Sequence, residues 1–268
     1  MSQPLAPEPT ARATITDADL VTIQNTAGMH LTFSMTLACP LRCAHCIVKA
    51  GPKVKGTTLP LEMAARYASQ MEDLFDYGIR MVSFTGGEPL LMRRQLKVLS
   101  DAAASAGMAC GVVTASHWAH SDAAARDVVA RYPGIHTWDL SLDAWHKDYL
   151  PYDYVRRAYG AAKAAGRRAV LRFTYNEPMS AADREAFDFI HSFADAADVY
   201  SQRLRSVGRG DFVPIGRSSD QTTLAKPCVT KGLVAWRPAA STWWRSAHTP
   251  FSLATRQCAH CAPCWKTT

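Results

Sequence analysis

The chain has 268 residues, 48% of them hydrophobic, which is enough to bury the core of one large domain. It contains no run of about 18 apolar residues, so we expect no membrane-spanning helix and no membrane partner. The net charge of +7 lies almost wholly in residues 221–268, and residues 1–220, with 24 basic and 23 acidic side chains, offer no uniformly basic face for nucleic acid.

In chain order, the hydrophobic pattern predicts strands and helices that alternate. Residues 1–28 are expected to be a mobile, Pro-rich lead-in and not a secretory signal. Strands are expected at 30–36, 79–85, 109–116, 136–143 and 167–176, with a sixth before residue 217. Helices are expected over 60–78, 90–107, 121–133, 152–166 and 180–196, with Gly78 ending the first.

Repeated strand–helix units of this kind predict the α/β class, with a parallel sheet and outer helices. Six units are too few for a complete eight-stranded barrel. We therefore predict a partial (β/α)6 barrel over residues 29–219, followed by a small cysteine-rich C-terminal extension at 220–268. "CPLRCAHC", "TGGEP", "SLDAWH" and "TYNEP" each follow a predicted strand, so all four should meet at the functional rim of the barrel.

The cysteines fall into groups. Without a predicted secretory signal, they favour metal ligands or catalytic groups in a reducing, cytoplasmic setting over a disulfide framework. Cys39, Cys43 and Cys46 form a C-x3-C-x2-C pattern. Three thiolates leave one iron of a four-iron cluster without a protein ligand, and an open coordination position favours a catalytic cluster. Cys110, in an apolar run, is expected to be a buried small hydrophobic residue.

This pattern resembles the radical S-adenosylmethionine (radical SAM) enzymes, in which C-x3-C-x2-C follows the first strand. His45 stands just before the third cysteine, where the family carries an aromatic-type residue. Gly86, Gly87 and Glu88 match the family's GGE motif after the second strand, and Pro89 follows them. "SLDAWH" at 141–146 resembles the S-x-D motif of members with extra clusters. The resemblance covers roughly residues 28–218.

The resemblance implies that the three cysteines hold a [4Fe–4S] cluster whose open iron binds S-adenosylmethionine. It further implies that the GGE residues meet the methionine amino group, since glycines permit close backbone approach and a carboxylate complements an ammonium. Ser141 and Asp143 would contact the ribose hydroxyls. Arg172 would pair with the methionine carboxylate. The backbone of residues 213–217 would line the adenine.

The resemblance also implies the reaction. One electron from a donor such as flavodoxin or ferredoxin cleaves S-adenosylmethionine to a 5′-deoxyadenosyl radical, which takes a hydrogen atom from a small biosynthetic intermediate or a precursor peptide. Two other functions remain open: a non-catalytic iron–sulfur or zinc protein in electron transfer or scaffolding, and a pseudoenzyme with a decayed tail.

Several polar and aromatic residues near the rim also have simpler interpretations. Arg172 could equally form a structural ion pair. Ser141 could instead form a hydrogen bond with the backbone at the end of its strand. Packing is the favoured role for His45, Trp118, Trp138 and Trp145. His146 is expected to lead a helix, whereas Tyr175 and Asp143 are weaker candidates for substrate contact.

The last 48 residues hold Cys228 and a C-x2-C-x2-C run, Cys258, Cys261 and Cys264. They resemble the SPASM or twitch extension that carries auxiliary clusters, but the cysteine expected after the first hairpin is missing. Three interpretations remain open: one auxiliary [4Fe–4S] cluster on these four cysteines, a zinc site with the same ligands, with or without His260, or an unligated, degraded tail.

Overall fold

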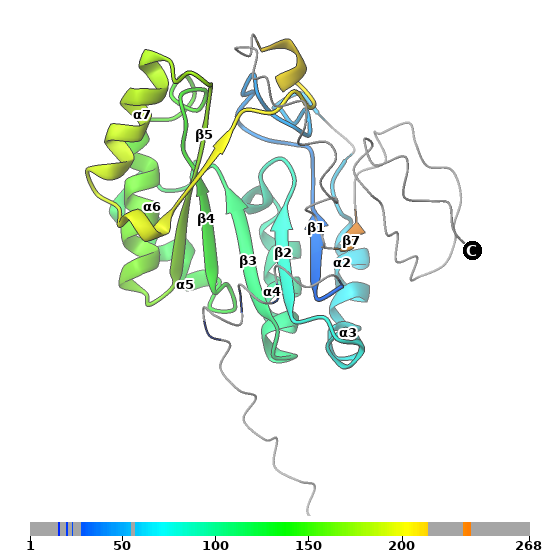
Figure 1. Ribbon diagram of the computed structural model, residues 1–268. Coiled ribbons are helices and arrows are strands. Elements are labelled where there is room, and N and C mark those ends of the chain that lie inside the picture. The colour runs from blue at the N-terminus through cyan, green and yellow to red at the C-terminus, as the bar shows by residue number, and fades with distance from the viewer. Residues whose placement is uncertain are drawn as a thin grey trace, which may run out of the picture.

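The computed structural model describes residues 28–54, 57–213 and 233–236, together with Thr16, Leu20 and Ile23. Its centre is a parallel sheet of seven strands in the order β6-β5-β4-β3-β2-β1-β7 (Figure 1). The strands are β1 (His30–Ser34), β2 (Met81–Thr85), β3 (Ala109–Thr114), β4 (Thr137–Ser141), β5 (Arg168–Tyr175), β6 (Val199–Arg203) and β7 (Leu233–Trp236). Because β6 and β7 are the edges, the sheet is open in the described part of the chain.

Helices join successive strands, and Figure 1 shows α4 to α7 lying against one face of the sheet. The helices are α2 (Leu61–Ala68), α3 (Met71–Tyr77), α4 (Arg93–Ser105), α5 (Asp122–Arg131), α6 (Tyr152–Ala164) and α7 (Ala181–His191). Short 3-10 turns occupy Pro89–Leu91, Ala196–Asp198 and Gly210–Phe212. Within the described residues, no helix combines the length and apolar composition needed to cross a bilayer.

The predicted α/β fold with six parallel strands is confirmed, and two details differ from the expectation. The helix predicted over 60–78 is two helices, interrupted at Ser69 and Gln70, where Gln70 leaves the helical region with φ −109° and ψ 6°. A seventh strand, β7, pairs with β1 although it lies inside the predicted C-terminal extension. The boundary placed at residue 220 stays a prediction.

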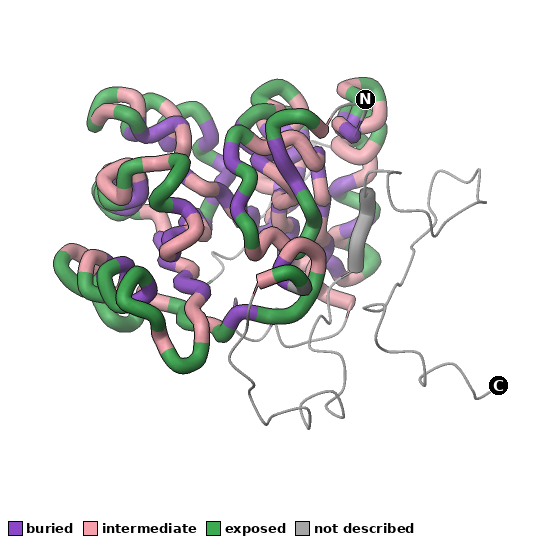
Figure 2. Tube along the Cα trace, turned by 90° about the horizontal axis from the view of Figure 1, so that it is seen from above, coloured by how far each residue is buried: buried purple, intermediate pink, exposed green. Residues whose placement is uncertain are grey.

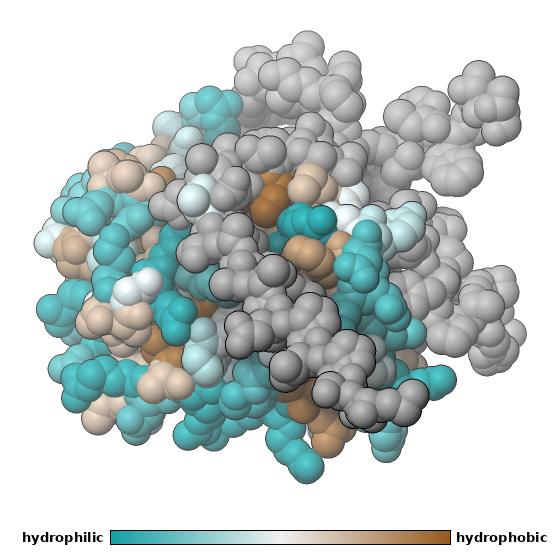
Figure 3. Space-filling model, turned by 90° about the horizontal axis from the view of Figure 1, so that it is seen from below, coloured by the Kyte–Doolittle hydropathy of each residue, from teal (hydrophilic) through white to brown (hydrophobic). Residues whose placement is uncertain are grey.

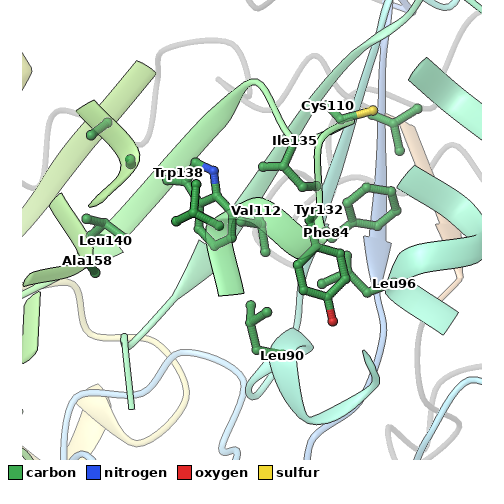
Figure 4. Close-up of a cluster of buried hydrophobic side chains, with 14 of the residues drawn as sticks. Phe84, Leu90, Leu96, Cys110, Val112, Tyr132, Ile135, Trp138, Leu140 and Ala158 are labelled. Carbon is green, nitrogen blue, oxygen red and sulfur yellow. The ribbon is translucent and has the colours of Figure 1, made fainter. Parts of the chain in front are cut away.

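The main hydrophobic core lies between the sheet and the helices. Alternate strand residues point into it, among them Phe84 on β2, Val112 on β3 and Trp138 on β4. Figure 4 shows these side chains packed with Tyr132. Cys110 also lies in this core as predicted, and burial raises the pKa of its thiol to about 12.

The opposite face of the sheet, which we call the inner face, carries polar or small residues at one level across the middle of β1 to β3. Thr32, Ser83 and Gly111 lie side by side there on β1, β2 and β3. Toward the lower end, Leu20 and Ile23 pack against Met81 and Ala109, whose register also places them on this face. The inner face is therefore polar or small at these middle positions of β1 to β3 and apolar at its lower end.

Views along the strands separate the two ends of the molecule. Seen from above, buried segments lie at the centre of the described part of the molecule, and exposed loops surround them (Figure 2). From below, the visible described surface is mainly hydrophilic, with small apolar areas (Figure 3). The carboxyl ends of the strands lie at the upper end of the molecule in Figure 1. The stretches that follow them, "CPLRCAHC", "TGGEP", "SLDAWH" and "TYNEP", therefore lie at this end as well.

Replacing Ser180 by Ala is expected to lower the free energy of unfolding by about 1 kcal/mol. The Ser180 hydroxyl accepts the Asp183 backbone N–H, and the Asp183 carboxylate accepts the Ser180 backbone N–H, which closes a capping box at the start of α7. Urea denaturation measures the change. Ser201→Ala, at an exposed position of β6, serves as the control, and equal stability of the two variants would contradict the assignment.

Candidate active site

The first cysteine group forms a loop directly after β1, and we call residues 39–46 the cysteine loop. Cys43 is buried, Cys39 and Cys46 are half-buried, and all three carry free thiols. The base of the loop is fixed by the Gly51 N–H, which donates to the Leu37 carbonyl oxygen at 3.0 Å. The fold thus holds three potential soft ligands on one short segment at the upper end of the sheet.

The donor set fits a multi-iron cluster better than a single ion. Among the described residues, only His45, Asp143 and His146 have ligand atoms that all lie within 4.8 Å of one another. At least one pair of the three cysteine sulfurs therefore lies more than 4.8 Å apart, which exceeds the separation of about 3.8 Å that a single tetrahedral zinc imposes. Burial raises the pKa of the Cys39 thiol to about 12, with the Glu88 charge adding to it, so a bound cation would favour its thiolate form.

The GGEP turn lies directly against residues 35–38, which lead from β1 into the cysteine loop. The Gly87 N–H donates to the Thr36 carbonyl oxygen at 2.5 Å, and the Glu88 N–H to the Ala38 carbonyl oxygen at 2.9 Å. A Cβ on Gly86 would lie 2.4 Å from the Thr36 oxygen, and Gly86 has a φ of +131°. Only glycines allow this approach, so the turn and the loop that the sequence analysis paired are brought together in space.

Glu88 is fully buried, and both of its carboxylate oxygens accept hydrogen bonds from the protein. The donors are the Leu90 N–H at 3.0 Å, the Thr114 hydroxyl at 2.9 Å and the Ala115 N–H at 2.9 Å. Pro89 begins the buried 3-10 turn that follows. Glu88 therefore ties the end of β2 to the end of β3, in addition to any contact with an ammonium group.

Asp143 is also buried, and two histidines share its carboxylate. Its Oδ1 lies 2.7 Å from His146 Nδ1, and its Oδ2 lies 3.1 Å from His45 Nε2. Burial opposes ionisation of Asp143, but the two imidazoles outweigh it and hold its pKa below the usual range. Burial would lower the pKa of His146, yet the Asp143 carboxylate, with help from the Cys43 thiol, raises it well above 6.5.

Ser141 and Arg172 are register partners on β4 and β5, and both are half-buried on the inner face. The Arg172 guanidinium forms a two-bond ion pair with Asp139 and lies over the Tyr200 ring at 5.1 Å. Burial alone would lower the pKa of Arg172, but the hydrogen bonds to Asp139 raise it. The ion pair that was one of the two interpretations of Arg172 is therefore present.

The aromatic residues divide between core and rim. Trp118 and Trp138 are buried together in the core, as expected. Trp145 packs against His45 at the rim, with ring centroids 4.6 Å apart and ring planes tilted by 30°. His146 does not lead a helix but sits buried beside the cysteine loop. Tyr175 is half-buried at the end of β5, where its ring stacks on Phe173.

Arg209 was missed by the sequence analysis. Its Nε donates to the Cys43 carbonyl oxygen at 2.9 Å, and its backbone N–H donates to the Cys46 carbonyl oxygen at 3.0 Å. Gly208 lies so close that a Cβ would be 2.3 Å from the Ile47 carbonyl oxygen. The glycines on either side of Arg209, in "VGRGD", were the available signal for such a close approach.

The predicted tail ligands Cys228, Cys258, Cys261 and Cys264 lie outside the described residues. Of the segment 213–217 predicted to line the adenine, only Val213 is described. Residues 233–236 are the described part of the C-terminal extension, and they contribute backbone to the sheet.

Comparison with known proteins places these features in context. The sequence pattern of the Radical SAM superfamily matches residues 33–172. The antilisterial bacteriocin subtilosin biosynthesis protein AlbA of Bacillus subtilis is 38% identical over 60 residues, which are 22% of this chain and 12% of AlbA. The GTP 3',8-cyclase of Mycolicibacterium smegmatis is 31% identical over 179 residues, which are 62% of this chain and 47% of the cyclase. The chain thus spans less than half of either relative.

Among solved structures, anSMEcpe with bound AdoMet superposes with a TM-score of 0.50 at 13% sequence identity. The match covers 66% of this chain and 51% of anSMEcpe. At that identity, the likeness concerns the fold, and it agrees with the open parallel sheet described above.

Proposed function

This chain belongs to the radical S-adenosylmethionine superfamily and is an enzyme, and we propose that Cys39, Cys43 and Cys46 hold its catalytic [4Fe–4S] cluster. The family implies both the cluster and S-adenosylmethionine as cofactors. The observation that carries the proposal is the contact between the GGEP turn and Thr36 and Ala38, the residues that lead from β1 into the cysteine loop, fixed by two backbone hydrogen bonds. It places three thiols and a Gly-Gly backbone side by side at the carboxyl ends of β1 and β2.

When bound, the cluster and S-adenosylmethionine would supply one-electron cleavage of the sulfonium, with the electron coming from an external donor, to give methionine and a 5′-deoxyadenosyl radical that takes a hydrogen atom from the substrate. The chain's own groups bind and orient. Gly86 and Gly87 permit close approach of a methionine amino group to the backbone, and Glu88 supplies negative charge behind them.

We assign the ribose to Ser141, which is half-buried on the inner face at the end of β4. Asp143 is a weaker candidate for this contact because both of its oxygens already accept hydrogen bonds from histidines. Arg172 reaches a methionine carboxylate only by sharing its donors with Asp139.

The substrate is a small biosynthetic intermediate or a precursor peptide with a polar group at the reacting end. Support comes from the inner face, where the Asp139–Arg172 pair and the hydrogen-bonded Thr174 and Gln202 side chains offer both charges and neutral polar groups. The named relatives include a nucleotide cyclase and a protein of bacteriocin biosynthesis, which is why both substrate classes stay in the proposal.

Formation of 5′-deoxyadenosine tests the proposed function directly. Reconstituted protein, incubated anaerobically with S-adenosylmethionine and dithionite, is expected to release 5′-deoxyadenosine, and Cys43→Ala is expected to release none, because it removes one of three cluster ligands. Cys110→Ala is the matched control, since this buried cysteine lies in the core under the helices and its loss should leave the product yield intact. Equal yields of 5′-deoxyadenosine from the unsubstituted protein and from Cys43→Ala would contradict the proposal.

We further propose that an acidic one-electron donor such as flavodoxin or ferredoxin docks on the outer surface of the cysteine loop. Residues 28–61 contain no Asp or Glu. Arg42, Lys49 and Lys53 are exposed there, together with the apolar Ile47 and Val48. Exposed basic and apolar side chains on one segment complement the surface of an acidic electron-transfer protein.

The paired substitution Lys49→Glu, Lys53→Glu is expected to slow turnover with reduced flavodoxin at least tenfold at low salt, whereas turnover with dithionite stays unchanged. The control is Arg126→Glu, on the exposed side of α5 away from the loop. Raising the salt concentration should reduce the difference between the flavodoxin-dependent rates of the unsubstituted and the doubly substituted protein. An unchanged rate with flavodoxin would rule out this docking surface.

For the C-terminal extension, we propose one auxiliary [4Fe–4S] cluster on Cys228, Cys258, Cys261 and Cys264, and we place the enzyme in the cytoplasm, where thiols remain reduced. The number of irons per chain tests whether the extension binds this auxiliary cluster. Two clusters contain about eight irons per chain, and Cys228→Ala should leave about four. About four irons in both proteins would leave the tail without a cluster.

A further inference from the structure

The chain after β6 returns to the cysteine loop, and we call residues 207–210 the return turn. Figure 1 shows this part of the chain, yellow to gold, crossing the upper end of the molecule toward the blue loop that follows β1. Arg209 lies in the return turn and contacts Cys43, which is 166 positions earlier. The proposed function assigns no task to Arg209.

Arg209 forms hydrogen bonds with the backbone of two of the three proposed ligand residues. Its Nε donates to the Cys43 carbonyl oxygen at 2.9 Å, and its backbone N–H donates to the Cys46 carbonyl oxygen at 3.0 Å. Each of these oxygens also closes a local turn. The Cys46 N–H donates to the Cys43 oxygen at 3.2 Å, and the Lys49 N–H donates to the Cys46 oxygen at 3.3 Å. Because a carbonyl oxygen has two lone pairs, Arg209 occupies the second acceptor position of both.

Two glycines allow the return turn to approach the loop so closely. Gly208 has a φ of +68°, and a Cβ there would lie 2.3 Å from the Ile47 carbonyl oxygen. A Cβ on Gly210 would lie 2.4 Å from the Arg205 carbonyl oxygen. In both cases the obstacle is backbone, which leaves little room for the turn to shift. The sequence therefore places Arg209 between two residues that only glycine can occupy without rearrangement.

The Arg209 guanidinium has a donor that no described residue uses. Its Nη2 is buried and has no hydrogen-bond partner among the described residues. A guanidinium stays charged throughout the pH range of folded proteins. A buried donor of a charged group is costly when it is left unpaired, and a nearby anion offsets that cost. Thiolate ligands would give the proposed cluster the required negative charge.

We infer that Arg209 is a positioning residue that fixes Cys43 relative to Cys46 and brings a permanent positive charge to the proposed cluster. The inference rests on the proposed function, because its second part requires the cluster. Reduction adds negative charge to the iron and sulfur atoms, and a neighbouring cation stabilises the reduced state. Removal of the guanidinium should therefore loosen the cysteine loop and move the midpoint potential of the cluster to more negative values.

Amide hydrogen exchange of the cluster-free protein, measured by mass spectrometry, tests the first part without any cofactor. Arg209→Met keeps an unbranched side chain but removes the donor and the charge. The amides of Cys46 and Lys49 are expected to exchange about tenfold faster, the effect of losing one hydrogen bond from a charged donor. Arg205→Met is the matched control, because Arg205 is an exposed arginine on the same segment, and it should leave exchange of these amides unchanged.

A redox titration of the reconstituted protein, followed by electron paramagnetic resonance with iron counted per chain, tests the second part. Arg209→Met is expected to lower the equilibrium constant for reduction about tenfold, which corresponds to about 59 mV for one electron. Arg209→Lys keeps the charge but not the planar fork of donors. It is expected to recover most of that shift, and Arg205→Met should show none.

Unchanged amide exchange in Arg209→Met, or a full cluster at an unshifted potential, would overturn the inference and leave the proposed function standing. If Arg209→Met holds no iron, Arg209→Lys decides: a full cluster close to the unsubstituted potential supports the inference, and any other result overturns it. Absence of a four-iron cluster from the unsubstituted protein would instead defeat the proposed function itself.

Discussion

Gly87→Ala is expected to separate the GGEP turn from the cysteine loop and to reduce 5′-deoxyadenosine formation about a hundredfold. A Cβ at this position would lie 2.2 Å from the Ala38 carbonyl oxygen. The obstacle is backbone, and that backbone is itself held by the Glu88 N–H at 2.9 Å. No side chain can move to relieve the clash, so the turn must shift away from the loop.

The same substitution should lower the free energy of unfolding by about 1–3 kcal/mol, the usual cost of forcing extra volume into a packed site. Gly160→Ala is the matched control. It lies in α6 with no heavy atom within 4 Å of an added Cβ, so it should stabilise the helix by up to about 1 kcal/mol and leave product formation unchanged. Full activity in Gly87→Ala would show that the turn and loop need not touch.

The parts of this fold that the sequence predicted well are those set by short-range periodicity. β3 reads "ACGVVT", an apolar run expected of a strand covered on both faces, and glycines or prolines mark the ends of its neighbours. Once the strands are known to be parallel, the stretches that follow them must share one rim. The pairing of the cysteine loop with the GGEP turn followed from topology alone.

The parts that could not be predicted depend on contacts between distant residues. Tyr149 and Arg42 are 107 positions apart, and Arg209 and Cys43 are 166 apart. Periodicity places Asp139 and Arg172 on one face of the sheet but does not say that they pair. It likewise assigned Asp143 to the rim without revealing the two histidines that occupy its carboxylate.

Trp138→Ala is expected to have the largest effect on stability, lowering the free energy of unfolding by about 3–5 kcal/mol. Trp138 is fully buried on β4, between the sheet and the helices, with the Trp118 ring 5.3 Å away (Figure 4). Truncation there leaves a cavity that the surrounding strands cannot close. Urea denaturation of the cluster-free protein, followed by circular dichroism, measures the change without a contribution from bound iron.

Two further substitutions separate core packing from aromatic character. The buried Trp138 indole N–H has no hydrogen-bond partner among the described residues, so Trp138→Phe forfeits no hydrogen bond and should cost much less than Trp138→Ala. Trp145→Ala, which removes a half-buried ring packed against His45, should cost about 1 kcal/mol. If Trp145→Ala proved as destabilising as Trp138→Ala, the rim would carry as much stability as the core, contrary to its lower burial.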